Sequence, residues 1–132
     1  MPKTMGILGR KVGMTRVYNE MGRSIPVTVI EAGPCTVLQK KTMAGEGYNA
    51  IQVGFLEKKP SRLNKAEAGH CKRSGAGGFY HITEFRVSDP EAYELGQQVT
   101  VKELVNIGDK IHISGTSKGR GFQGVVKRHG FK

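Results

Sequence analysis

Glycine limits what this chain can fold into. It supplies 19 of the 132 residues, about twice its average usage of roughly 7%. Glycine loses more conformational freedom on folding than any other residue, and it disfavours helix interiors by roughly 0.5–1 kcal/mol relative to alanine. The excess therefore predicts many turns, bulges and extended segments, and few helices.

Short apolar alternations between turn signals favour β-strands. Residues 26–30 (PVTVI) are strand-like and end at the turn 32–34 (AGP), after which residues 35–39 (CTVLQ) follow. The apolar side chains of residues 50–55 (AIQVGF) alternate, which places them on one face of a strand. Three further runs or pairs are similar: residues 83–87, Val99 with Val101, and Ile111 with Ile113. The pattern predicts a mainly β protein built as a small antiparallel barrel.

Helical signals are few. Asn64 and Glu67 have the spacing of a capping box, but Gly69 follows within five residues. Thr100 and Glu103 have the same spacing and predict a single helical turn. No internal repeat or low-complexity linker divides the chain. We therefore expect one β-barrel domain over residues 1–116, with an excursion over residues 57–78, followed by a basic extension over residues 117–132.

The charge is strongly positive and unevenly placed. The formal net charge is +10, from 21 Lys and Arg against 11 Asp and Glu, which predicts an anionic partner, with nucleic acid first. Basic residues concentrate in residues 1–16, 57–73 and 117–132, whereas residues 83–116 are mildly acidic. For any one block a merely solvated face remains an alternative. No basic amphipathic helix, lipidation signal or long apolar run favours a membrane.

The last sixteen residues form the most basic block. Residues 117–132 hold five Lys and Arg and no acidic residue, with glycines and rings interleaved. Such a segment lacks the apolar surface for a packed core, but it can lie against RNA, with cations on phosphates and rings on bases. Phe122 has two open interpretations, RNA contact or packing back onto the barrel, and Phe131 is a further candidate for stacking. The predicted RNA-binding residues of this arm are Lys118, Arg120, Phe122, Lys127, Arg128, His129 and Lys132.

Nucleotide, metal and catalytic motifs receive no support. Residues 119–124 (GRGFQG) match G-x-G-x-x-G, but a dinucleotide site needs a following helix and an acidic residue about 20 positions later. Only eight residues follow Gly124, and none is acidic. His70 and Cys71 are adjacent, and Cys35 lies far away, so zinc-ligand spacing is absent. We expect no enzyme activity, no cofactor, no metal and no small-molecule substrate. Two isolated cysteines predict a reducing, cytoplasmic compartment.

Several stretches, in order along the chain, resemble one known family. Residues 6–15 (GILGRKVGMT) are similar to the opening of the ribosomal protein L-three family, the universal third protein of the large ribosomal subunit, in its bacterial type. Residues 25–30 and 47–54 resemble the next strands of that family, and residues 65–70 its small excursion. Residues 115–128 (GTSKGRGFQGVVKR) resemble the entry into its RNA-penetrating extension.

The resemblance implies a translation-protein-type β-barrel from which a long loop runs through large-subunit ribosomal RNA towards the peptidyl transferase centre. It implies a non-catalytic structural constituent of the large ribosomal subunit that binds 23S-type RNA, assists early assembly and lies beside neighbouring large-subunit proteins. Lys118, Arg120, Lys127 and Arg128 would contact the RNA backbone as the loop leaves the barrel. The resemblance adds three weaker candidates at the first strand: Lys3, Arg10 and Lys11.

This chain departs from the family in two respects. Many relatives carry an indole near position 129, where this chain has His129. The family also continues well beyond position 132, so we expect a truncated chain or a fragment whose barrel is incomplete. Two other functions remain as alternatives: a non-ribosomal small-barrel nucleic-acid-binding protein, and an enzyme that uses the glycine-rich loop on a nucleotide.

Overall fold

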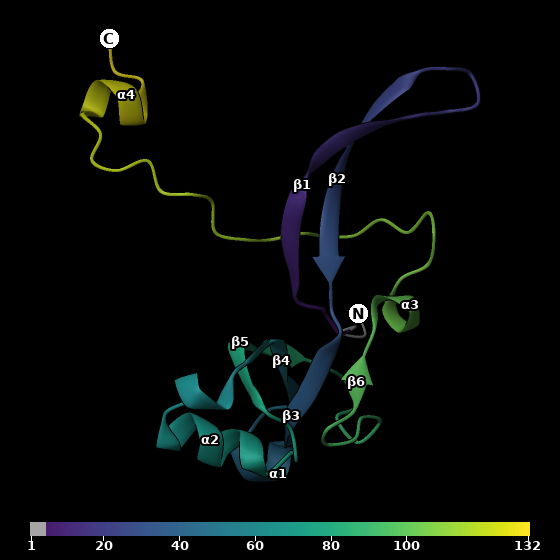
Figure 1. The fold of residues 1–132 in the computed structure, drawn as a ribbon, viewed down its shortest axis with the longest axis vertical. Helices are drawn as coiled ribbons and strands as arrows, with labels where there is room; N and C mark the ends of the chain where they lie inside the picture. Colours follow the sequence, from purple (N-terminus) through teal and green to yellow (C-terminus); the bar gives the residue numbers. More distant parts are fainter. Residues whose placement is uncertain (1–4) are drawn as a thin grey trace.

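A long antiparallel hairpin opens the fold (Figure 1). The structure is a computed structural model that describes residues 5–132. Strand β1 (Gly9–Tyr18) pairs with β2 (Ser24–Ala32), and the register shifts between Lys11 and Gly13. Both strands are largely exposed, because no third strand joins them in the 2-stranded sheet.

A second, four-stranded sheet follows in the spatial order β5-β4-β3-β6. All its pairings are antiparallel. Its strands are β3 (Cys35–Lys41), β4 (Ala50–Lys58), β5 (Gly78–Arg86) and the two-residue β6 (Gln98–Val99). Short helical segments fill the connections: α1 (Met43–Glu46), the 3₁₀ turn η1 (Pro60–Arg62), α2 (Lys65–Lys72), α3 (Val101–Leu104) and α4 (Val125–His129).

The predicted mainly β class is confirmed, and the two sheets do not close into a barrel, as expected for an incomplete one. The strands predicted at residues 26–30, 35–39 and 50–55 lie within β2, β3 and β4. The strand expected around Ile111 and Ile113 is wrong. Those side chains are 58% and 67% exposed on a segment without helix or strand, which pairs with no strand of the described chain. Val101 also differs, since it begins α3.

The main core lies on the four-stranded sheet. Its buried residues are Met5, Cys35, Val37, Ile51, Val53, Phe55, Val87 and Val99. A smaller cluster joins α2 to the sheet through Cys71, Leu38 of β3 and Phe79 of β5. Each cluster unites residues far apart in sequence, so the excursion over residues 57–78 is held against the sheet by its own apolar contact.

Helix α2 confirms the capping box predicted at its start. The Asn64 side-chain oxygen accepts from the Glu67 backbone N–H at 2.7 Å, and the Glu67 carboxylate accepts from the Asn64 N–H at 3.4 Å. The helix nevertheless continues through Gly69 to Lys72. Burial of Cys71 offsets the unfavourable glycine, because tertiary packing outweighs a propensity difference of about 1 kcal/mol. The single turn predicted after Thr100 is also confirmed, as α3.

Residues 109–121 carry no helix or strand, and in Figure 1 their trace crosses the view of the β1–β2 hairpin before it leads to α4. The composition did not predict α4. Its five residues contain no glycine, and Gly130 ends it in the left-handed conformation at φ 69°. The division of the chain at residues 116 and 117 stays a prediction. In the described residues, no helix is both long and apolar enough to cross a membrane.

Candidate nucleic-acid interface

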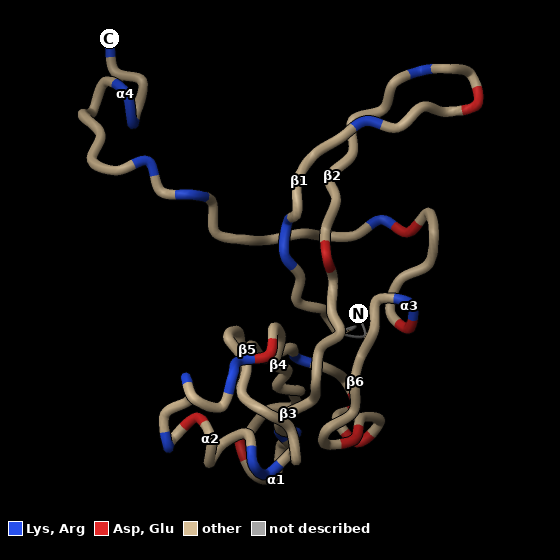
Figure 2. Tube along the Cα trace, viewed as in Figure 1, with Lys and Arg blue, Asp and Glu red and all other residues tan. Residues whose placement is uncertain are grey.

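The arm, residues 117–132, presents cations without acidic neighbours. Asp109 is the last acidic residue of the sequence, and Figure 2 shows only basic charges beyond it. All seven arm residues predicted to bind RNA are exposed. None of the ion pairs found among residues 5–132 involves the arm. The arm charges are therefore unneutralised within the described chain.

The exposure of Phe122 bears on its two predicted interpretations, RNA contact and packing back onto the barrel. Its relative exposure is 111%, so the ring packs on nothing in the described structure. Packing back onto the sheet is excluded for this conformation. RNA contact by Phe122 stays a prediction, and an exposed aromatic ring close to Arg120 and to the basic helix α4 is a group on which a base can stack.

Helix α4 gathers three of the predicted residues. Lys127, Arg128 and His129 are consecutive, so their side chains point about 100° apart around the helix axis. The turn at Gly130 brings Phe131 back, and its ring meets His129 edge to face at a centroid distance of 6.2 Å and an angle of 69°. The end of the arm thus carries basic side chains that point in different directions around α4, together with the paired rings of His129 and Phe131.

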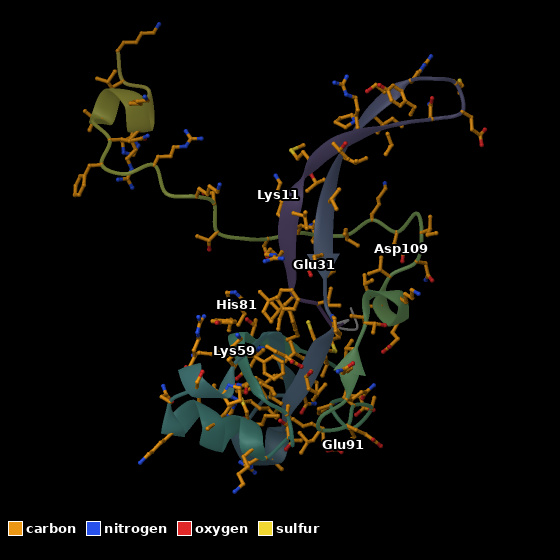
Figure 3. All side chains as sticks on the ribbon, viewed as in Figure 1. Lys11, Glu31, Lys59, His81, Glu91 and Asp109 are labelled. Atoms are coloured by element: carbon orange, nitrogen blue, oxygen red, sulfur yellow. The ribbon has the colours of Figure 1, made fainter. Side chains whose placement is uncertain are left out.

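The first strand places its predicted residues differently. Arg10 pairs with Glu31 of β2, Nη2 to Oε2 at 2.8 Å, and both side chains are about half exposed. Lys11 is exposed beside the register shift of β1, and Figure 3 labels it on the strand next to Glu31. Arg10 is therefore partly neutralised, whereas Lys11 forms no ion pair with any of residues 5–132. Lys3 lies outside the described residues.

Sequence reasoning missed a polar network around Tyr48. Its hydroxyl donates to Glu84 at 2.8 Å, and Lys41 Nζ donates to the hydroxyl at 3.0 Å and lies 2.7 Å from the Glu84 carboxylate. Lys41 Nζ and the Arg86 guanidinium lie 5.4 Å and 5.1 Å from the ring centroid, both within cation–π range. No local motif signals this group, because residues 48 and 84 lie 36 positions apart and meet only in the folded chain.

The network shifts the pKa values of its charged members. The Lys41 hydrogen bond, helped by those from Tyr48 and Gln52, lowers the pKa of Glu84, although burial opposes the shift. The same pair raises the pKa of Lys41 above its ordinary value. Gln52 extends the network to α2, because its amide oxygen accepts a hydrogen bond from His70 Nε2. The contacts therefore tie β3, β4, β5 and α2 together.

The histidines and cysteines do not assemble into a metal centre. No group of three or more His, Cys, Asp or Glu side chains with metal-binding geometry occurs within residues 5–132. Both thiols are buried, and burial raises the pKa of Cys35 and of Cys71. A raised pKa disfavours the thiolate, which is the form that binds metal or attacks a substrate.

Comparisons with known proteins identify the family. No family model matches the chain. The large ribosomal subunit protein uL3 of Desulfotalea psychrophila is 63% identical over 132 residues, which cover 100% of this chain and 63% of that protein. The uL3 proteins of Carboxydothermus hydrogenoformans and Geobacter metallireducens are 55% and 53% identical over 99% and 96% of the chain. The chain belongs to the uL3 family. The resemblance predicted from the sequence is thereby confirmed.

The match covers the arm as well as the sheets. The alignment with the Desulfotalea uL3 protein takes in all 132 residues, so the glycine-rich arm belongs to the same family sequence as the β1–β2 hairpin. The chain spans about three fifths of the length of these relatives, at 63%, 61% and 60%. The structure therefore describes one portion of the uL3 architecture.

Proposed function

We propose that the chain is a structural constituent of the large ribosomal subunit, in the cytoplasm, that binds large-subunit ribosomal RNA through its arm. The observation that carries this proposal is the identity of 51–63% with uL3 proteins over nearly the whole chain. The physical support is the arm itself, which exposes its cations and rings and has no acidic neutraliser among the described residues.

Binding through the arm would be mainly electrostatic. Each Lys or Arg that meets a phosphate releases condensed counterions, so the affinity falls steeply as salt rises. The exposed Phe122 ring and the His129–Phe131 pair supply stacking surfaces. Glycines 119, 121 and 124 have open space where a Cβ would stand, which lets RNA approach the backbone closely.

The finer roles follow from the family resemblance. We infer that the chain assists early subunit assembly, lies beside other large-subunit proteins and supports the peptidyl transferase region without performing catalysis. The RNA contacts inferred for this role are Lys118, Arg120, Phe122, Lys127, Arg128, His129 and Lys132 on the arm, with Lys3, Arg10 and Lys11 at the start of the chain.

Cofractionation tests the proposal. We expect the tagged chain to sediment with large subunits in lysate gradients, to remain there through a moderate salt wash and to come off after nuclease treatment. A variant with Lys118, Arg120, Lys127 and Arg128 changed to Gln should shift by more than half into the free pool, because about four phosphate contacts are lost. Neutralising as many cations within residues 57–73 should have a smaller effect.

Three results would contradict the proposal. A wild-type chain found wholly in the free soluble pool would favour the non-ribosomal nucleic-acid binder. Magnesium-dependent ATP binding at micromolar affinity, measured by calorimetry, would instead favour the nucleotide-using enzyme. Equal losses from the arm variant and the residue 57–73 variant would show that the arm is not the principal contact.

A further inference from the structure

A second aromatic surface with cations around it lies at the β4–β5 end of the four-stranded sheet. Tyr80 of β5 is 48% exposed. The Arg62 guanidinium of η1 donates from Nη1 to the Tyr80 hydroxyl at 3.0 Å, and Lys58 Nζ of β4 lies 5.9 Å from the ring centroid. Three different elements therefore bring one ring and two cations together.

The charges of this group are only partly neutralised. Lys58 pairs with Glu67 of α2 at 2.9 Å. Arg62 makes no ion pair with any carboxylate of residues 5–132, and Tyr80 takes only one of its five N–H donors. Lys59 and His81, labelled in Figure 3, are exposed at the same end of the sheet. Arg62 and Lys59 are therefore available to an external anion.

The position of Arg62 is fixed by the fold around it. The side chain of Leu63 fills the space where a Cβ at Gly78 would stand, so it holds the end of η1 against the start of β5. The capping box at Asn64 begins α2 directly afterwards, and Glu67 of that box also holds Lys58. These contacts place the guanidinium beside Tyr80 before any ligand arrives, which lowers the ordering cost of binding.

We propose that the Tyr80 patch (Lys58, Lys59, Arg62 and Tyr80) is a second RNA contact, separate from the arm, that holds an unpaired nucleotide. The inference rests on the proposed RNA-binding function. Arg62 and Lys59 bind the phosphates, because guanidinium and ammonium donors match phosphate oxygens. The half-exposed Tyr80 ring stacks on the base. An acidic peptide would satisfy the cations but would leave the ring without a planar partner.

Filter binding of the full chain to deproteinised large-subunit ribosomal RNA tests the patch. The Lys59→Gln/Arg62→Gln variant should bind about tenfold more weakly near 0.1 M salt, and its slope of log affinity against log salt should fall by about 1.4, since each single-strand phosphate contact contributes roughly 0.7. Tyr80→Leu should lose about tenfold with an unchanged salt slope, because stacking releases no counterions. Tyr80→Phe keeps the ring and should lose less than threefold.

A matched control carries the same charge change elsewhere. Arg23→Gln/Lys102→Gln removes one exposed arginine and one exposed lysine outside both the patch and the arm, and should stay within about twofold of wild type. A second measurement needs no variant: RNA that contains 4-thiouridine should crosslink on irradiation to the wild-type tryptic peptide spanning residues 74–86. Absence of that crosslink, or patch variants that bind RNA as tightly as the control variant, would overturn this inference and leave the proposed function standing. A wild-type chain that does not bind the RNA would overturn the proposed function with it.

Discussion

Two glycines show how a single Cβ can have opposite effects in this chain. A Cβ at Gly54 of β4 would lie 2.5 Å from two ring atoms of Phe79, which is itself buried in the cluster under α2. A Cβ at Gly69 of α2 would meet nothing within 4 Å. The first glycine is therefore required by packing, whereas the second only weakens its helix.

Gly54→Ala should lower the free energy of unfolding by about 1–3 kcal/mol, because Phe79 must move within a packed cluster. Gly69→Ala should raise it by roughly 0.5–1 kcal/mol, since alanine is the better helix former. Urea unfolding followed by circular dichroism measures both changes. The packing argument fails if Gly54→Ala is neutral, and the helix argument fails if both substitutions destabilise to the same extent.

Among the elements, the Lys41–Glu84 pair fixes β3 to β5 across the sheet. The pKa of Glu84 is lowered in the folded state, so the folded protein binds fewer protons than the unfolded chain below about pH 4.3. The stabilisation is complete above that pH and is lost as the pH falls towards the lowered pKa. The raised pKa of Lys41 acts at the alkaline end: its contribution to stability is complete below about pH 10.4 and is lost as the pH rises from there towards the raised pKa.

Glu84→Gln should cost about 1 kcal/mol at pH 7, because the lost ion pair is partly exposed. Its melting temperature should fall less steeply than that of wild type between about pH 5 and 3. Glu91→Gln is the control, since Glu91 pairs with Lys40 at 2.9 Å but its side chain is 69% exposed. Thermal melts between about pH 5 and 3 measure the effect. If the melting temperatures of wild type and Glu84→Gln fell equally steeply over this range, the stabilising role assigned to the Lys41–Glu84 pair would be contradicted.

At the scale of the whole molecule, the arm and the sheet differ in accessibility to a protease. Lys118, Arg120, Lys127 and Arg128 are exposed on the arm, whereas the side chains of Lys41 and Lys58 are each only 18% exposed and ion-paired. Brief trypsin digestion should therefore cut the arm first and leave a product that keeps the four-stranded sheet.

Bound large-subunit ribosomal RNA should slow the arm cleavage at least several-fold, if the arm is the contact. Mass spectrometry of timed samples gives the order of the cuts. Early cleavage at Lys41 or Lys58 would contradict the stability assigned to the sheet. Unchanged arm cleavage in the presence of bound RNA would contradict the proposed role of the arm.

The sequence determined those features of this protein whose signals are local. Glycine content and apolar alternation predicted a mainly β fold, and the Asn64–Glu67 spacing predicted the start of α2, because both depend on residues within one turn or strand. The arm holds basic residues and no acidic residue, and this composition alone predicted its candidate RNA contacts. The failed strand at Ile111 and Ile113 marks the limit of such signals, since an alternating pattern cannot supply a pairing partner.

Tertiary structure decided everything that depends on strand register. Packing of the connecting segments beside the sheet brings Tyr48, just before β4, to Glu84 of β5, 36 residues away, and Arg62 of η1 to Tyr80 of β5, 18 residues away. The pairing of β4 with β5 leaves no room for a Cβ at Gly54 beside Phe79, while the path of the arm leaves Phe122 bare. The physical reason is that strand pairing joins residues distant along the chain, and no short window of sequence contains both partners.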